Sequence, residues 1–301
     1  MRLLIIGGTG QLSGRLTAMA LTDGHEVWTL NRGSKLAPEG VHALTADRKD
    51  DESVRRALEK ADARWDAVID CICMNADNAR QDLALLADYT RRLVVVSTDS
   101  VYHPAHKTVP QDENGRVYLT DGGYGAHKRL MEEAFLAADT HIRWTLFRPG
   151  HIFGEGFLPG CFPEQSRQRT LLAHMRAGQP LRLVGGGQYL IHPIYVDDLA
   201  RALLDCIDKP AAENEIFCIG GPDVVTNAAY YACLGQILGC EPVIETIPEE
   251  GYLDAHPECS GHLCHRAYSL DKLRRAGIAL PGTSLEEGLR RQVAWLDAQE
   301  E

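Results

Sequence analysis

The sequence lacks the long apolar segments and the basic surplus that membrane-spanning and nucleic-acid-binding proteins need. No apolar run in its 301 residues approaches the roughly 20 residues that cross a bilayer. Its formal net charge of −11 disfavours sequence-independent binding to nucleic acid or to a membrane surface. The first apolar run is short and soon followed by glycines, unlike a signal peptide. We therefore expect a cytoplasmic protein that acts on a small-molecule substrate, with no nucleic acid and no membrane as partner.

The sequence also lacks the cysteine patterns of disulfide frameworks and zinc modules. Its nine cysteines are scattered, mostly within apolar segments, which is typical of free thiols in a reducing compartment. One group of soft metal-ligand types contains no Cys-x2-Cys knuckle, so we expect no metal site there, and the role of the group stays open. Its members are His256, Cys259, His262, Cys264 and His265.

What the sequence does have is a strand, a glycine turn and a helix at its start. Arg2–Ile6 is an apolar run, the stretch that follows reads GGTG, and Gln11–Leu21 has helical spacing. Glycines let a phosphate approach the backbone, and free N–H groups at a helix N-terminus bind it. This arrangement predicts dinucleotide binding. The predicted contacts in this stretch are Gly7, Thr9, Gly10, Gln11 and Leu12.

The first half of the chain continues as alternating strands and helices, which predicts a doubly wound parallel sheet of the Rossmann type, class α/β. The further strands are expected at Glu26–Leu30, Val41–Thr45, Ala67–Ile72, Arg92–Ser97 and Trp144–Phe147. The further helices are expected at Asp51–Ala61, Asn78–Tyr89 and Tyr124–Ala138. We predict a dinucleotide-binding domain over residues 1–150, with part of 185–220 returning to it.

The second half predicts a smaller α/β substrate lobe over residues 151–301. Its strands are expected at Leu181–Val184, Ile216–Ile219 and Glu241–Ile247. Its helices are expected at Arg167–Arg176, Asp197–Ile207, Thr226–Leu238 (opening on a capping threonine), Leu270–Ala276 and Leu285–Ala298. The ligand cleft is expected between the two lobes, at the carboxyl ends of the strands.

The end of the second strand bears on the choice of cofactor. An acidic residue there normally accepts hydrogen bonds from the adenosine ribose of NAD. This chain has Asn31 followed by Arg32, with Lys35 close by. A guanidinium suits a 2′-phosphate, so the sequence favours NADP, with NAD as the alternative.

A second group of residues points to proton transfer. Tyr124 and Lys128 are four apart at the start of a helix and share a face. An ammonium near a phenol lowers the pKa of the phenol, which makes tyrosine a usable general acid or base. Thr98 follows the fifth strand in a run of hydroxyl residues, where it can hydrogen-bond the same substrate oxygen.

These motifs together resemble the extended branch of the short-chain dehydrogenase/reductase superfamily, which includes NAD-dependent epimerases and dehydratases. The resemblance covers most of the chain and continues in FRPGHIFG from Phe147, IYVDDLA from Ile194 and SLDK from Ser269. It implies hydride transfer at a carbinol carbon. Tyr124 would move the hydroxyl proton, Lys128 would hold the nicotinamide ribose, and Thr98 would polarise the oxygen. It also implies cofactor contacts at Asp47, Arg48, Cys71 and Pro149.

Departures from this family pattern bear on the reaction and the substrate. Ser13 stands where the branch usually has a third glycine, and Ser100 replaces the glutamate that takes part in dehydratase elimination. Ile191 and His151 stand where nucleotide-sugar enzymes use an arginine and an asparagine.

We therefore expect an NAD(P)-dependent oxidoreductase or epimerase that acts on a sugar-like or other small hydroxy or carbonyl compound. The predicted substrate contacts are Asp99, His151 and His192, although Asp99 could instead be a satisfied strand-end carboxylate. A nucleotide-sugar 4-epimerase and a non-catalytic NADP-binding sensor or RNA-binding relative remain alternatives. A homodimer through the helices near Asn78–Tyr89 and Tyr124–Ala138 is possible.

Overall fold

The apolar runs of the first half pair side by side in the computed structural model, which describes residues 1–115, 117–120 and 122–300. They form a seven-stranded parallel sheet with the order β11-β6-β5-β4-β1-β2-β3. The strands are β1 (Arg2–Ile6), β2 (Glu26–Asn31), β3 (Val41–Thr45), β4 (Ala67–Asp70), β5 (Arg92–Val96), β6 (Arg143–Pro149) and β11 (Glu215–Ile219). This order confirms the predicted doubly wound Rossmann-type sheet.

Helices cover both faces of this sheet because its strands are apolar on both sides. In β1, Leu3 and Ile5 belong to one buried cluster and Leu4 and Ile6 to another, as the alternation of side chains along a strand requires. The first face is covered by α1 (Gln11–Thr22), α6 (Val196–Asp205) and α9 (Asp271–Arg275). The second face is covered by α2 (Asp51–Ala61), α3 (Ala76–Leu85) and α4 (Gly123–Leu136). Fully burying one such Leu or Ile contributes roughly 1.5–3 kcal/mol.

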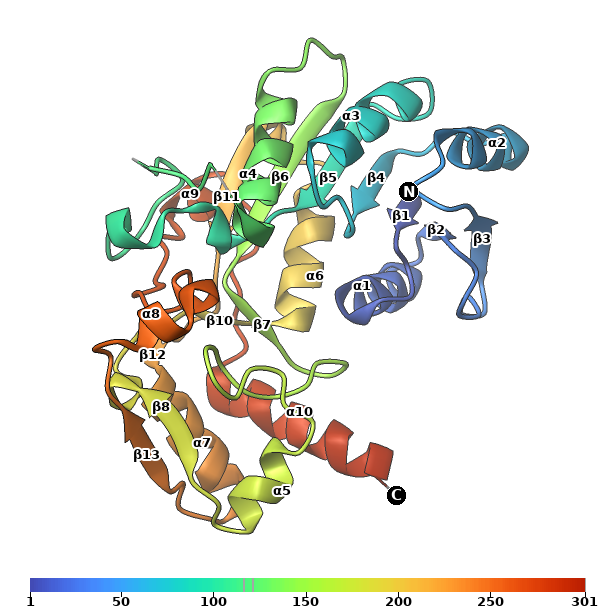
Figure 1. The fold of residues 1–301 in the computed structure, drawn as a ribbon. Helices are drawn as coiled ribbons and strands as arrows, with labels where there is room; N and C mark the ends of the chain where they lie inside the picture. The colour runs from blue at the N-terminus through green and yellow to red at the C-terminus, as the bar shows by residue number, and fades with distance from the viewer. Residues whose placement is uncertain (116, 121, 301) are drawn as a thin grey trace.

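A smaller lobe lies beyond the carboxyl ends of the strands, below the large sheet in Figure 1. Its strands pair two by two, β7 with β10, β8 with β13 and β9 with β12. These strands are β7 (His151–Phe153), β8 (Leu181–Val184), β9 (Leu190–Ile191), β10 (Pro193–Tyr195), β12 (Val225–Thr226) and β13 (Ile244–Ile247). The helices α5 (Leu171–Arg176), α7 (Asn227–Leu238) and α10 (Leu285–Glu300) surround a third apolar cluster, and the lobe also contains the short α8 (Tyr252–Ala255). None of the described helices combines the length and the apolar character needed to span a membrane.

The chain crosses between the two lobes several times. It leaves the large sheet after β6, returns to it with α6 and β11, and returns again when α9 packs against β11. Figure 1 shows α6 beside α1 under the large sheet and α10 in the smaller lobe. Segments from both halves of the sequence therefore contribute to the large sheet and its covering helices.

Most predicted helix ends agree with the structure to within a few residues. The predicted N-caps include Thr226, whose hydroxyl accepts a hydrogen bond from the backbone N–H of Ala229 at 3.0 Å. The helix predicted from Arg167 was wrong at its start, because α5 begins at Leu171. The reason is local: Arg167 has a left-handed backbone with φ of 52°, which interrupts a right-handed helix.

Candidate active site

Two adjoining cavities open at the carboxyl ends of the parallel strands, where the strand order reverses between β1 and β4. One has a volume of about 530 Å³ and is called here the Asn31 cavity. The other has a volume of about 610 Å³ and is called the Tyr124 cavity. Both are lined by Gly10, Ile72 and Met74, so they form one continuous cleft. Ligands of open α/β sheets bind in this position.

The glycine turn brings the backbone close to the sheet at the junction of the two cavities. Gly8 has a φ of 36°, and a Cβ atom there would lie 2.3 Å from Cγ2 of Thr29. Helix α1 then begins at Gln11 without a side-chain cap, and Ser13, the departure from the family's third glycine, accepts a hydrogen bond from Gly10 N–H at 2.9 Å. An uncapped helix N-terminus leaves N–H groups that can bind an anion.

The remaining predicted contacts of this stretch lie around the same turn. Gly7, Thr9 and Gly10 line the Asn31 cavity. Gln11 and Leu12 line the Tyr124 cavity, as do Cys71 and Pro149. The Gln11 amide also donates a hydrogen bond to the carbonyl of Gly156 at 2.7 Å, which ties α1 to the loop after β7.

The Asn31 cavity presents donors and positive charge. The side-chain oxygen of Asn31 accepts from Gly33 N–H at 2.8 Å, while its buried Nδ2 has no partner among the described residues. Arg32 and Lys35 are exposed and line the cavity, and Asp47 lies at its rim, where it accepts from Lys49 N–H at 3.0 Å. This is a suitable environment for an anionic group rich in oxygen.

Arg48, a predicted cofactor contact, lines the Asn31 cavity, but its guanidinium is engaged by carboxylates of the protein. The guanidinium turns inward and forms ion pairs with the buried carboxylates of Asp70 and Asp82, the latter at 2.6 Å. Burial by itself lowers the pKa of Arg48, but the two carboxylates raise it overall. Arg48 therefore ties the ends of β3, β4 and α3 together beneath the cavity.

Thr98, Tyr124 and Lys128 meet at the floor of the Tyr124 cavity. Thr98 is buried just after β5, where its hydroxyl accepts a hydrogen bond from Ser100 N–H at 3.2 Å, and Tyr124 lies near the start of α4. Lys128 lies one turn later, with its ammonium 5.8 Å from the centre of the Tyr124 ring. The ammonium donates to the carbonyls of Cys73 at 2.7 Å and Val96 at 2.8 Å.

The predicted lowering of the Tyr124 pKa by Lys128 was wrong for this structure. Removal of the hydroxyl from water raises the pKa of Tyr124, and the nearby Thr98 side chain only partly opposes this. Burial also lowers the pKa of Lys128, because the charged ammonium is removed from water. The proton therefore resides on Tyr124, which can donate it to a bound oxygen.

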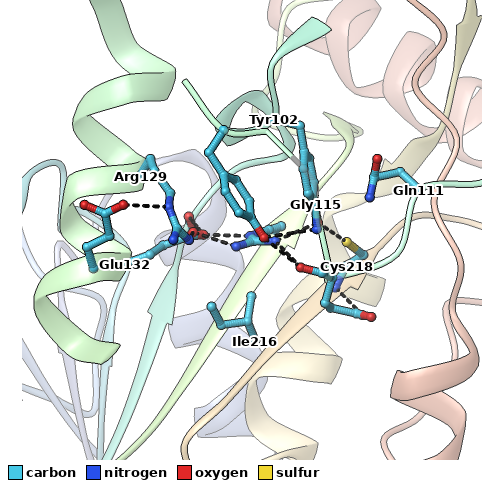
Figure 2. A network of polar contacts seen from close by, with 12 residues as sticks. Tyr102, Gln111, Gly115, Arg129, Glu132, Ile216 and Cys218 are labelled. Carbon is cyan, nitrogen blue, oxygen red and sulfur yellow. Dashed lines mark hydrogen bonds and ion pairs between the residues drawn. The ribbon is translucent and has the colours of Figure 1, made fainter. Parts of the chain in front are cut away.

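A buried polar network fixes α4 relative to the sheet (Figure 2). Glu132, two turns beyond Tyr124 on α4, accepts a hydrogen bond from Ser97 at 2.7 Å and two from Arg148 at 2.8 and 2.7 Å. Arg148 also donates to the hydroxyl of Tyr102 at 2.6 Å, and that oxygen lies 3.0 Å from Sγ of Cys218. Since Ser97 precedes Thr98, the network sets the distance between the strand end and the helix that carries Tyr124.

Asp99 is a satisfied carboxylate in the wall of the Tyr124 cavity. It is 1% exposed and accepts hydrogen bonds from Arg266 at 2.8 and 2.7 Å and from the Tyr268 hydroxyl at 2.6 Å. Burial by itself raises the pKa of Asp99, but Arg266, Lys107 and the Tyr268 hydrogen bond lower it overall. Asp99 is therefore ionised and paired, which suits a wall residue more than a proton donor.

The two predicted substrate histidines have different positions. His151 lines the Tyr124 cavity, and burial lowers its pKa to about 3, so the ring is neutral near pH 7. His192 lines neither cavity. Its ring accepts from Tyr268 N–H at 3.1 Å and contacts the Gly221 carbonyl at 2.7 Å, beneath the cleft.

Several cavity residues were not predicted as substrate contacts. Phe157, Phe162, Arg167 and His262 line the Tyr124 cavity from the smaller lobe. Phe162 and His262 stack with ring centroids 3.9 Å apart although they are a hundred residues apart in sequence. They come from loops without periodicity, so the sequence offered no signal except the cationic charge of Arg167.

In the described part of the chain, the one group with metal-ligand geometry is Asp70, Cys73 and Asp82, and the Arg48 guanidinium is paired with its carboxylates. His262 instead faces the Tyr124 cavity.

The comparisons with known proteins agree with this geometry. The model of the NAD dependent epimerase/dehydratase family matches residues 3–220. A 2'-dehydrokanamycin reductase of Streptomyces kanamyceticus is 30% identical over 71% of this chain, and the match spans 60% of that relative's length. A 2-alkyl-3-oxoalkanoate reductase of Stenotrophomonas maltophilia is 28% identical over 97% of this chain and 98% of its own.

Solved structures show the same fold. The UDP-glucose 4-epimerase of Thermotoga maritima, solved with UDP-glucose, superposes with a TM-score of 0.81 over 100% of both chains at 20% identity.

Proposed function

The chain belongs to the NAD-dependent epimerase/dehydratase family, and on that premise we propose that it is an NADP-dependent oxidoreductase or epimerase. It would transfer hydride at a carbinol or carbonyl carbon of a sugar-like or other small hydroxy compound. The observation that carries this proposal is that Thr98, Tyr124 and Lys128 line one cavity, which continues into the Asn31 cavity. Tyr124 as proton donor and Thr98 as the hydroxyl that binds the substrate oxygen would then lie beside the proposed dinucleotide site.

The residues of the cleft fit a nicotinamide dinucleotide. The uncapped start of α1 suits the pyrophosphate, and the close approach of Gly8 to Thr29 leaves no room for a side chain at the turn. The unpartnered Nδ2 of Asn31 is a donor for the adenosine ribose or its phosphate. Arg32 and Lys35 support NADP over NAD because each can place a positive charge at a 2′-phosphate.

In the proposed mechanism, the bound nicotinamide supplies or accepts the hydride. Tyr124 donates its proton to the substrate oxygen during reduction and takes it back during oxidation. Thr98 orients that oxygen through a second hydrogen bond. Lys128 is fixed by two backbone carbonyls, with its ammonium 5.8 Å from the centre of the Tyr124 ring, where it would hold the nicotinamide ribose.

We further propose that the substrate carries no nucleotide. Ile191, at the position where nucleotide-sugar enzymes use an arginine, is 5% exposed and lines neither cavity. A diphosphate buried without a cationic partner is unfavourable. The names of the two relatives reported above, a 2'-dehydrokanamycin reductase and a 2-alkyl-3-oxoalkanoate reductase, support a carbonyl substrate of another kind.

The test is a screen for hydride transfer with a matched pair of tyrosine variants. NADP and NADPH absorbance is followed with panels of free sugars, polyols, hydroxy acids and oxo acids, beside UDP-glucose. Tyr124→Phe should lower kcat by about 10²–10⁴ with little change in NADP affinity, because it removes one general acid. Tyr89→Phe, whose ring packs against Trp65 away from both cavities, is the control. Near-normal turnover by Tyr124→Phe would contradict the assignment.

A further inference from the structure

Four charged side chains line the Tyr124 cavity, and three of them have their polar atoms engaged within the protein. Asp99 and Arg266 form a buried ion pair. Lys128 donates to two backbone carbonyls. The fourth is Arg167, which forms no ion pair with any residue that the structure describes. The cavity therefore carries one positive charge that the described protein does not neutralise.

The guanidinium of Arg167 makes few polar contacts with the rest of the protein. Its Nη1 is buried without an acceptor among the described residues, and its Nη2 lies 3.4 Å from the Ile152 carbonyl, at the limit of a hydrogen bond. The guanidinium stacks over Phe157, 4.6 Å from the ring centre. The backbone adopts a left-handed φ of 52°, an uncommon conformation for arginine that concentrates at functional sites. A buried N–H group without an acceptor is unfavourable until a ligand supplies one.

Arg167 lies on the substrate side of the cleft. It lines the same cavity as Tyr124 and His151. The stack of His262 on Phe162 also lines this cavity, and the buried Nδ1 of His262 lacks a partner among the described residues. Burial lowers the pKa of His262 to about 4, so this ring offers a polar nitrogen but no charge near pH 7.

We propose that Arg167 recognises an anionic group of the substrate, a carboxylate or a phosphate monoester, on a small hydroxy or carbonyl compound. A planar guanidinium presents paired N–H donors that match two oxygens of such a group. His262, which lines the same cavity, provides a further hydrogen bond. This assignment rests on the proposed function and narrows its substrate class to anionic compounds without a nucleotide.

The other arginines of the smaller lobe do not supply a second free charge for a diphosphate. Arg266 is paired with Asp99, and Arg182 lies outside the cavity near Glu164 and Glu245. Arg169 is exposed and does not line the cavity. One free guanidinium matches one anionic group.

The experiment measures binding to the NADP-loaded protein by calorimetry, using pairs of compounds that differ in the anionic group. Acetoacetate against its methyl ester tests a carboxylate, galacturonate against galactose tests a sugar acid, and glucose 6-phosphate against glucose tests a phosphate. The wild type should bind the anionic member of at least one pair about 10- to 100-fold more tightly, the range of a hydrogen bond to a charged group. R167Q should reduce this preference to about twofold. R167K keeps the charge but loses the paired N–H donors of the guanidinium, so its preference should lie between those of the wild type and R167Q.

R169Q is the matched control, because it removes the same charge two residues away from an exposed position and should keep the preference. Equal binding of charged and neutral members by the wild type, no binding by any anionic member, or an unchanged preference in both R167Q and R167K would overturn the assignment. So would a loss of NADP affinity in R167Q without a change in anion preference, because Arg167 would then bind the cofactor. Anion binding without hydride transfer to any compound would refute the proposed function but leave this site standing.

Discussion

Removing the charge of Glu132 is the sharpest test of how the catalytic helix is held. Glu132 and Arg148 are both fully buried, two hydrogen bonds join them, and Glu132 accepts further hydrogen bonds from Ser97 and from Arg129, the latter at 3.1 Å. Glu132→Gln keeps the shape but leaves the Arg148 charge buried without its counterion, which costs roughly 3–5 kcal/mol of unfolding free energy. With an unfolding entropy of about 2.1 cal/mol/K per residue, a chain of 301 residues should lose about 5–8 °C in Tm.

The assay is thermal unfolding of the purified variant beside Glu133→Gln. Glu133 is the next residue on α4, and its side chain is 49% exposed, so removal of its charge should change stability by less than about 1 kcal/mol. The double variant Glu132→Leu/Arg148→Met should recover part of the loss, because it removes both charges together. In Glu132→Gln, kcat should also fall, since α4 carries Tyr124 and small displacements of a catalytic group reduce the rate. Equal Tm values for Glu132→Gln and Glu133→Gln would refute the reasoning.

Three further outcomes can be checked with single substitutions. Gly8→Ala places a methyl group 2.3 Å from Thr29 and should lower NADP affinity by at least about tenfold. Gly24→Ala is the control, because Gly24 also has a left-handed φ but has open space around it, and it should keep the affinity. Equal affinities of the two variants in a calorimetric titration would argue against the close approach. Arg32→Ala should weaken NADP binding by about tenfold and leave NAD binding nearly unchanged. The expected loss is no larger because solvent screens the charge of this exposed side chain. A wild-type preference for NAD would reject that assignment. His151 has a folded pKa of about 3 against an ordinary 6.5, so the unfolded chain binds more protons between these values. The stability that the neutral His151 ring allows is therefore complete above pH 6.5 and is lost as the pH falls, by up to ~1.4 kcal/mol per pH unit. His151→Asn should flatten the dependence of the unfolding free energy on pH, measured by denaturant titrations at several pH values. An identical dependence in the variant would contradict the neutral buried ring.

The cofactor half of the fold could be predicted from the sequence because its signals are local. The apolar run of β1, the glycine turn and the start of α1 are consecutive, and each element's preference agrees with its neighbours. The spacing of Tyr124 and Lys128 is likewise set by one helical turn. Strand alternation then determined the parallel sheet, because only right-handed crossovers join such strands.

The substrate half could not be predicted in the same way because its contacts join distant segments. Asp99 and Arg266 pair across 167 positions, and no periodicity connects them. The inward turn of Arg48 depends on Asp82 on a later helix, which no local pattern reveals. The direction of the Tyr124 pKa shift depends on how deeply the hydroxyl is buried, a property of the assembled cleft.

Buried charged groups that are paired within the protein differ in position from buried polar groups that lack a partner. Arg48, Arg148 and Arg266 each have a buried carboxylate partner, and these pairs join elements that must keep their positions around the cleft. Asn31 and Arg167 instead have buried nitrogen atoms without partners among the described residues, and each lines one of the two cavities. An unsatisfied buried donor costs about 1–3 kcal/mol, and oxygen atoms of a ligand in either cavity would offset this cost. This reasoning supports the proposed positions of the dinucleotide near Asn31 and of the anionic substrate group near Arg167.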